Sequence, residues 1–303
     1  MHKIAVCIPT YKRPDILKQL LDSIAKNNFD KSLIQNIDII VVDNDADKTA
    51  EVVINCLKSE ANKPYQLHYY NYTVKGLSHV RNELIRRGLS FDPDFLIFID
   101  DDEYVTTEWM NELLRTIIRN NSDAARGPVF VKLSDYIPKD ISKLFVRENY
   151  ANNTLISTWT TGNLILRRTS LQKYNVWFDD RFSKTGAEDS YFGIQMSKKG
   201  ATIYWAANAI TYEIIPDARA SVQWYIKRMY RGANMFMYML VLEKSYLKII
   251  KKIGVSFFYI AAGIPALLML LSPIKKNYWG ILKLSEGIGG LAGLFNIRYR
   301  EYK

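Results

Sequence analysis

The first 130 residues alternate between two kinds of hydrophobic pattern. Continuous apolar runs, which suit strands buried on both faces, occupy residues 3–9, 37–43, 65–72 and 94–100. Apolar residues recur every three or four positions, as on one face of a helix, in residues 14–27, 48–60, 77–88 and 106–121. This alternation predicts an α/β fold with a mostly parallel central sheet and helices on both of its faces.

Local signals mark two of the predicted helix ends. Pro14 suits the first turn of a helix, where a missing amide hydrogen costs nothing. Gly88 is predicted to cap the C-terminus of the helix over 77–88.

The pattern is looser from about residue 122 to residue 215. It predicts a helix over 189–200 and strands over 124–133, 161–168 and 201–207. We expect these elements to complete the same domain as its acceptor half. No G-x-G-x-x-G follows the first strand and no G-x-x-x-x-G-K-[ST] occurs, so dinucleotide-binding and Walker-type sites are not expected.

Residues 253–272 are twenty residues without a charge, which is long enough to cross a membrane. Lysines flank the run on both sides, so the charge distribution leaves its orientation open. A second, weaker apolar run covers 278–296. We expect a membrane helix or a re-entrant hairpin whose basic ends contact anionic lipid. A buried helix of a soluble C-terminal subdomain is the alternative.

Charge and cysteine content narrow the function classes. The net charge is +10, but residues 241–303 hold ten Lys and Arg against three acids, so the first 240 residues carry only about +3. A nucleic-acid groove is therefore not expected. The two cysteines, Cys7 and Cys56, lie in a predicted strand and a predicted helix, which indicates reduced core thiols of a cytosolic domain.

Four adjacent carboxylates, Asp100 to Glu103, follow the apolar run that ends the fourth predicted strand. In open parallel sheets, ligands bind at the carboxyl ends of the strands. Clustered carboxylates there suit Mg²⁺ or Mn²⁺, which keeps waters and bridges to substrate phosphates. A solvated acidic turn is the other interpretation.

Three basic residues lie where an anion could bind. Arg13 follows the first strand, whereas Lys75 and Arg81 lie at the start of the helix over 77–88, where a helix N-terminus favours negative charge. Each alone could be a surface cation. Together with a metal cluster they suit a diphosphate.

Another pair of acids, Glu188 and Asp189, opens the predicted helix over 189–200. Asp189 could be a helix cap or a general base that takes a proton from a hydroxyl nucleophile. Serine and cysteine nucleophile chemistry is not expected, since G-x-S-x-G is absent and neither cysteine has an evident partner.

Taken in order, these motifs resemble the inverting family 2 glycosyltransferases with the GT-A fold, of the bacterial polysaccharide-biosynthesis type. The resemblance runs from about residue 3 to 235, and the matching segments are "VCIPTYKRP" (6–14), "VVDND" (41–45), "KGLSHVRN" (75–82), "FIDDDE" (98–103), "TTGNLILRR" (160–168) and "GAEDSYF" (186–192). It implies a GT-A catalytic domain over 1–240 and a membrane-associated helical segment over 241–303.

The resemblance also implies roles for individual residues. The residues of the nucleotide-sugar site would be Thr10, Tyr11, Arg13, Asp43, Asp45, Lys75, Arg81, Asp100 and Asp101. Within this set, Asp43 would hydrogen-bond the base, and Asp100 would form the D-x-D motif with Asp102, the direct ligand of Mn²⁺ or Mg²⁺. Asp189 would be the catalytic base. Many members place a metal-binding histidine where this chain has Glu213, which departs from the family pattern, and Glu213 would then bind the metal in its place.

Such an enzyme would transfer a sugar from a nucleotide-diphosphate sugar, a UDP- or GDP-sugar, to a hydroxyl of a saccharide or lipid-linked saccharide. It would work at the cytoplasmic face of the cell membrane. The processive Q-x-x-R-W motif is absent, so we expect addition of a single sugar. The alternatives are transfer to a polyprenyl phosphate and a non-catalytic membrane scaffold that binds sugar nucleotides.

Overall fold

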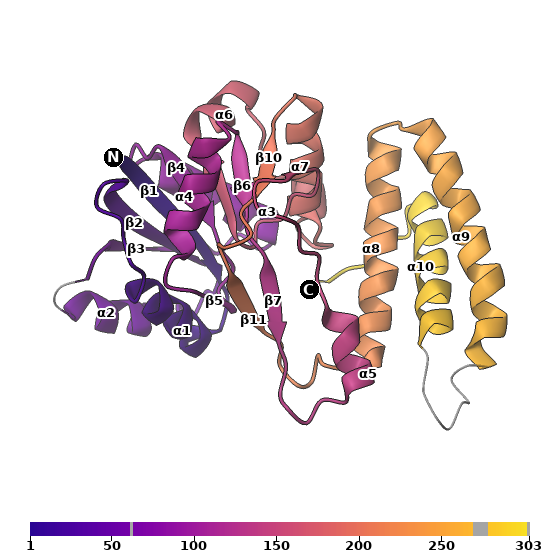
Figure 1. Ribbon diagram of the computed structural model, residues 1–303. Coiled ribbons are helices and arrows are strands. Elements are labelled where there is room, and N and C mark those ends of the chain that lie inside the picture. The colour runs from indigo at the N-terminus through magenta and orange to yellow at the C-terminus, as the bar shows by residue number, and fades with distance from the viewer. Residues whose placement is uncertain (61–62, 269–277, 302–303) are drawn as a thin grey trace. The chain divides into compact units, whose positions relative to one another are not determined.

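A computed structural model describes residues 1–60, 63–268 and 278–301 as two units (Figure 1). The first unit comprises Met1–Lys132, Arg147–Ser183 and Glu188–Ile214, and the second comprises Leu133–Val146, Lys184–Ala187 and Ile215–Lys303. The chain passes between them several times, so neither unit is one continuous segment.

The first unit is built on an eight-stranded sheet in the order β3-β2-β1-β4-β9-β6-β10-β8. Its strands are β1 (His2–Thr10), β2 (Ile34–Asp43), β3 (Gln66–Asn71), β4 (Phe95–Phe98), β6 (Ala124–Arg126), β8 (Leu155–Ile156), β9 (Leu164–Arg167) and β10 (Ile203–Trp205). The four strands predicted in the first 130 residues are adjacent and parallel. β9 runs antiparallel between β4 and β6, and β10 pairs parallel with β6. The prediction of a mostly parallel sheet is confirmed.

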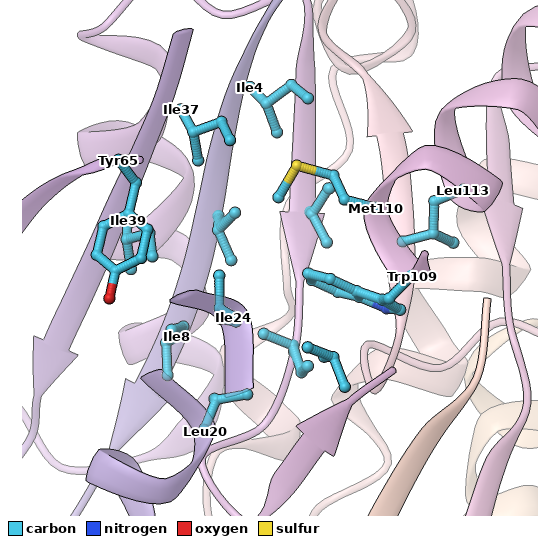
Figure 2. Packing of buried hydrophobic residues seen from close by; sticks show 14 of the residues in the cluster. Ile4, Ile8, Leu20, Ile24, Ile37, Ile39, Tyr65, Trp109, Met110 and Leu113 are labelled. Carbon is cyan, nitrogen blue, oxygen red and sulfur yellow. The ribbon is translucent and has the colours of Figure 1, made fainter. Parts of the chain in front are cut away.

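Helices cover both faces of this sheet. One face packs against α1 (Pro14–Ala25), α2 (Glu51–Ser59) and α4 (Trp109–Arg119), and the other against α3 (Leu77–Leu89), α6 (Arg168–Tyr174) and α7 (Glu188–Lys198). Figure 2 shows the first of these cores, in which Ile4 and Ile8 of β1 lie with Trp109 of α4. The alternate residues of β1, Ala5 and Cys7, belong to the opposite core. Burial on both faces explains why β1 reads as an unbroken apolar run.

A three-stranded sheet, in the order β5-β11-β7, accompanies the large one. It contains β5 (Glu103–Val105), β11 (Thr211–Ile214) and β7 (Val129–Lys132). The single strand predicted over 124–133 is therefore wrong, because the chain leaves the large sheet after β6 and enters the small one at β7. Gly127 and Pro128 cause the break: Pro128 has no amide hydrogen to donate, and a Cβ at Gly127 would lie 2.1 Å from the Ala209 carbonyl oxygen.

Two further expectations from the sequence need correction, while Pro14 does open α1 as predicted. Gly88 does not cap α3; it lies inside the helix, where a Cβ would be 3.1 Å from Leu96 and 3.3 Å from the Cys7 sulfur. The residue thus permits close packing of α3 on the sheet. Cys7 is a buried core thiol, but Cys56 is exposed.

The second unit contains α5 (Lys139–Ser142), α8 (Val222–Leu242), α9 (Tyr246–Ala266) and α10 (Trp279–Leu294). α10 packs against both α8 and α9, and glycines make the approach close. A Cβ at Gly289 would lie 2.3 Å from the Tyr230 carbonyl oxygen of α8, and one at Gly287 would lie 2.6 Å from the Ser256 carbonyl oxygen of α9.

The boundary expected at residue 240 falls inside α8. The compact units instead divide after Ile214, because α8 packs along α10 with the C-terminal helices. A catalytic domain over 1–240 and a membrane segment over 241–303 stay predictions about function.

Among the described residues, α9 is the one helix long and apolar enough to cross a membrane, and only 11% of its most apolar window is buried. Residues 269–272 of the predicted membrane run lie outside the described part of the chain.

Candidate active site

The end of β1 meets the acidic segment that follows β4, because these strands are parallel neighbours. The Thr10 hydroxyl donates a hydrogen bond of 2.8 Å to Asp101 Oδ2. Arg13, just past β1, donates from Nη1 to Asp101 Oδ1 at 3.3 Å and to Asp102 Oδ2 at 2.9 Å. Thr10 therefore contacts Asp101, another predicted donor-site residue, and Arg13 contacts both Asp101 and the predicted metal ligand Asp102.

Arg81 connects this acidic segment to the start of α7. Its Nη2 lies 3.1 Å from Asp100 Oδ1, and its Nη1 forms an ion pair with Glu188. Both Arg81 and Glu188 are almost completely buried. The interaction brings the residue before Asp189 to the D-x-D motif, although 88 positions separate Asp100 from Glu188 in the sequence.

Glu213 enters the same region from the small sheet. It stands directly opposite Glu103 in the antiparallel ladder between β11 and β5, and it forms an ion pair with Arg147. Glu103 is buried, and its Oε2 atom has no hydrogen-bond partner among the described residues.

The convergence of carboxylates raises their pKa values. Burial raises the pKa of Asp101 to about 6, although Arg13 and Thr10 oppose the rise. Burial, followed by repulsion from Asp100 and Glu213, raises the pKa of Asp102 to about 7. The pKa of Glu103 is raised well above its ordinary value, first by burial. Burial is the first cause in all three cases, and repulsion between the neighbouring carboxylates adds to it.

A divalent cation fits the chemistry of this donor set. Asp102 and Glu213 offer hard oxygen ligands, and a cation would offset the repulsion between their carboxylates. Across residues 1–60, 63–268 and 278–301, no group of three or more His, Cys, Asp or Glu side chains forms a preformed metal centre. Mg²⁺ and Mn²⁺ are commonly held by one or two carboxylates plus substrate phosphates, which is what this arrangement could provide.

Asp43 and Asp45, which the resemblance places at the nucleotide site, lie in the turn after β2 and are hydrogen-bonded within the protein. Asp43 is fully buried, and its carboxylate accepts hydrogen bonds from the amides of Asp45 and Ala50 and from the Tyr69 hydroxyl. Asp45 is also buried and accepts from the Thr49 hydroxyl at 2.8 Å. These contacts stabilise the turn after β2, so both carboxylates have a structural role within the protein.

The remaining predicted donor residues, Tyr11 and Lys75, are exposed. Asp189 is half-buried and is the second residue of α7, so it is not the N-cap residue. Its Oδ1 accepts hydrogen bonds from the amide of Ser190 at 2.6 Å and from the Ser190 hydroxyl at 3.3 Å.

Sequence reasoning missed Arg147 and Arg126. Arg147 lies 66 residues from Glu213 and follows no recognisable pattern, so only the fold reveals their pairing. Arg126 ends β6, is buried, and lies over the Trp205 ring at 5.2 Å. Burial lowers its pKa, while Asp189 and Glu103 are among the acids that act in the opposite direction. Arg126 is therefore part of the electrostatic surroundings of Asp189.

The sequence profile described as glycosyl transferase family 2 matches residues 5–174, which is more than half of the chain. The chain belongs to glycosyl transferase family 2. A related profile, glycosyl transferase family group 2, matches residues 95–285.

Curated relatives of this glycosyltransferase include the succinoglycan biosynthesis protein ExoM of Rhizobium meliloti (strain 1021). The two are 31% identical over 238 residues, which cover 76% of this chain and 72% of ExoM. The poly(ribitol-phosphate) beta-N-acetylglucosaminyltransferase TarS of Staphylococcus aureus (strain Mu50 / ATCC 700699) is 25% identical over 197 residues. That match covers 63% of this chain but only 32% of TarS.

Solved structures of similar fold include the mannosyltransferase PcManGT from Pyrobaculum calidifontis in complex with GDP-Man and Mn²⁺. It superposes with a TM-score of 0.66 at 13% identity, over 97% of this chain and 88% of that one. S. aureus TarS 1–349 in complex with UDP-GlcNAc superposes with a TM-score of 0.57 at 16% identity, over 98% and 93%. The GT-A fold of this glycosyltransferase is thereby confirmed.

Proposed function

We propose that this glycosyltransferase moves one sugar, with inversion, from a nucleotide-diphosphate sugar to a hydroxyl of a saccharide or lipid-linked saccharide in cell-surface polysaccharide assembly. The observation that carries the proposal is Arg81, which contacts Asp100 of the D-x-D motif and also Glu188, the neighbour of Asp189. The buried side chain of Arg81 thus connects the proposed donor site with the segment that carries the candidate catalytic base.

In this proposal the chain's own residues bind and orient the donor. Arg13 lies beside Asp101 and Asp102, where it can contact the diphosphate, and Arg81 lies deeper, against Asp100. Lys75 is exposed ahead of α3 and can reach a phosphate or the base. Thr10 fixes Asp101, which would face the donor sugar.

Asp102 would hold Mn²⁺ or Mg²⁺, with Glu213 as a second ligand in place of the histidine of other members. The bound cation would supply Lewis-acid stabilisation of the charge that develops on the leaving nucleoside diphosphate. Glu213 now pairs with Arg147, so ligation requires Arg147 to release it. PcManGT, whose structure contains GDP-Man and Mn²⁺, supports the use of a divalent cation by this fold.

Asp189 would act as the general base. Its carboxylate would take the proton from the acceptor hydroxyl as that oxygen attacks the anomeric carbon from the face opposite the diphosphate. One displacement breaks the bond between the sugar and the diphosphate and inverts the anomeric configuration. Tyr11, exposed beyond the end of β1, and the buried turn of Asp43 and Asp45 would shape the pocket for the base.

Attachment to the cytoplasmic face of the membrane would follow from the C-terminal helices. The outward side of α9 exposes a stripe of large apolar side chains, and these are Leu247, Ile250, Phe257, Phe258 and Ile264. Its buried positions are the small residues Ser256 and Gly263. The helix therefore exposes large apolar side chains and buries small ones, the reverse of a surface helix in a soluble protein. Lys248 and Lys251 also lie on its exposed side, which suits binding to anionic lipid.

The proposed function has two alternatives. Transfer to a polyprenyl phosphate would also suit a membrane-attached enzyme, and a scaffold that binds sugar nucleotides without turnover would use the same pocket. ExoM and TarS, which are named for succinoglycan biosynthesis and for glycosylation of poly(ribitol-phosphate), favour a saccharide or polymer acceptor.

A thermal-stabilisation panel tests the donor half of the proposal. UDP-glucose, UDP-N-acetylglucosamine and GDP-mannose would each be added with and without Mn²⁺, and the midpoint of unfolding measured. We expect at least one nucleotide to raise the midpoint in a Mn²⁺-dependent way, and Asp102→Asn to remove that dependence. If none of a broad set of sugar nucleotides stabilises the wild-type protein, the proposed donor class is wrong.

A further inference from the structure

The segment that leads into Asp189 has an unusual backbone. Gly186 and Ala187 both have positive φ angles, of 72° and 69°, and the next two residues are Glu188 and Asp189. A left-handed conformation costs an alanine about 1 kcal/mol. Such a conformation persists only where the surrounding structure holds it in place. The four residues Lys184–Ala187 therefore need external support to present Asp189 in one orientation.

The far C-terminal part of the described chain provides a contact to this segment. The amide of Glu301 donates a hydrogen bond of 2.9 Å to the carbonyl oxygen of Lys184. The carboxylate of Glu301 forms an ion pair of 2.6 Å with Arg231 of α8. Backbone and side chain of a single residue thus connect α8 to the segment before Asp189.

Residues 297–301 are themselves fixed on α8 by Asn234. This asparagine is fully buried; its Nδ2 donates to the Ile297 carbonyl at 2.8 Å, and its Oδ1 accepts from the Tyr299 amide at 3.1 Å. The same Nδ2 lies 3.2 Å from the Gly289 carbonyl oxygen of α10. The buried side chain of Asn234 therefore holds both α10 and residues 297–301, the segment that contacts Lys184.

We propose that residues 297–301 form a C-terminal strap that positions Asp189 by holding Lys184–Ala187 against α8. Glu301 and Arg231 are then positioning residues for the transfer reaction, since they act on the base only through the backbone of Lys184–Ala187. The inference rests on the proposed function, in which Asp189 is the base. It goes beyond that function by identifying the contacts that hold Lys184–Ala187, the segment that leads into the base.

A pair of substitutions at one position separates the strap from general stability. Glu301→Pro removes the amide hydrogen that bonds to Lys184 and also removes the carboxylate. Glu301→Ala removes the carboxylate alone and keeps the amide. Arg231→Gln, with Arg231→Lys as the conservative variant, tests the ion pair from its other side.

Two readouts are measured on the full chain. The first is hydrogen–deuterium exchange of the amides in residues 184–190, which needs no substrate. The second is the rate of nucleotide release with Mn²⁺ and whichever of UDP-glucose, UDP-N-acetylglucosamine or GDP-mannose stabilises the protein, analysed separately as kcat and KM.

We expect Glu301→Pro to speed exchange in residues 184–190 by about 2- to 10-fold relative to Glu301→Ala, which is the range for loss of one hydrogen bond. The same variant should lower kcat while leaving the donor KM unchanged. Arg231→Gln should have a smaller effect in the same direction, and Arg231→Lys should restore the wild-type values.

Equal exchange and equal kcat in Glu301→Pro and Glu301→Ala would overturn the strap. So would a fall in thermal midpoint with kcat retained, since that result describes a purely structural contact. Asp189→Asn is measured in parallel: if that variant keeps wild-type turnover, the assignment of the base is wrong, whereas an inactive Asp189→Asn beside an unaffected Glu301→Pro rejects the strap alone.

Discussion

The guanidinium of Arg81 forms a buried ion pair with Glu188, the residue that directly precedes Asp189. The other side of the same guanidinium contacts Asp100. The position of α7 relative to the D-x-D motif therefore depends on one side chain of α3.

Replacing Arg81 by Met should strongly destabilise the protein. The substitution leaves the carboxylate of Glu188 buried without its cation, and breaking a buried ion pair in this way costs about 3–5 kcal/mol. Urea denaturation followed by circular dichroism measures the loss. Arg81→Met combined with Glu188→Gln should recover part of it, because the double variant has no unpaired charge at this position.

The exposed Arg86, which pairs with Glu83 on the same helix, offers a matched control. Its replacement by Met should cost less than about 1 kcal/mol, as exposed ion pairs do. Similar losses for the two arginines would show that the Arg81–Glu188 pair is not the buried connection described here.

The raised pKa of Asp102, about 7, predicts how stability changes with pH. Between about pH 4 and pH 7 the folded protein binds a proton at Asp102 that the unfolded chain has released, so the free energy of unfolding falls as the pH rises over this range and levels off above about pH 7. Asp102→Asn removes this dependence. The variant should match the wild type near pH 4 and exceed its stability by about 4 kcal/mol at pH 8, since the pKa is raised by about three units and each unit corresponds to about 1.4 kcal/mol.

Mn²⁺ should act in the opposite direction, because it competes with the proton for Asp102. The rise in thermal midpoint on adding Mn²⁺ should be larger at pH 8 than at pH 6, and it should disappear on adding EDTA or in Asp102→Asn. A Mn²⁺ effect that is the same at both pH values and survives the substitution would place the cation elsewhere.

Substitution of Asp43 tests whether its carboxylate stabilises the fold or binds the base of the nucleotide. Its carboxylate already accepts three hydrogen bonds within the protein, so Asp43→Ala should leave buried donors unpaired and cost about 2–4 kcal/mol. Tyr69→Phe removes only one of these donors and should cost about 1 kcal/mol. Chemical denaturation gives both values. If Asp43→Ala keeps full stability and only weakens nucleotide binding, then the carboxylate binds the base of the nucleotide and does not stabilise the fold.

The outward face of α9 predicts binding to lipid. Phe258 is 63% exposed, and burying such a side chain in a bilayer contributes about 1.5–3 kcal/mol. Phe258→Glu should therefore weaken binding to vesicles of phosphatidylglycerol at least about tenfold, as measured by co-sedimentation. Val52, which is 76% exposed on α2 of the first unit, provides the control. A Val52→Glu variant that loses as much binding as Phe258→Glu would argue against a specific lipid-binding face.

Hydrophobic periodicity was sufficient to predict the core of the fold. Strands buried on both faces and amphipathic helices leave a strong local pattern, so the elements up to α4, apart from β5, were predicted with small errors at their ends. The three-residue strand β5 and the break at Gly127 were missed because they depend on contacts with β11 and Ala209, which are distant in sequence. Helix α8 was missed because its polar residues interrupt the apolar pattern.

The residues of the site that could be predicted are those that belong to recognisable sequence motifs. Arg13 and Arg81 contact the D-x-D carboxylates Asp102 and Asp100, and Thr10 contacts Asp101 between them. Arg147 could not be anticipated, since its pairing with Glu213 depends on how β11 is placed. The burial of Asp43 was equally hidden, because it depends on how the chain turns back from β2 to the start of α2.

The most direct test of the central proposal is release of nucleoside diphosphate from a sugar nucleotide with Mn²⁺, measured for the wild type, Asp102→Asn and Asp189→Asn. The wild type should release nucleotide only with the cation present. Asp102→Asn should lose both release and Mn²⁺ dependence, and Asp189→Asn should bind the donor normally but transfer the sugar at least about 100-fold more slowly, the usual contribution of a general base. Wild-type rates in both variants would contradict the account.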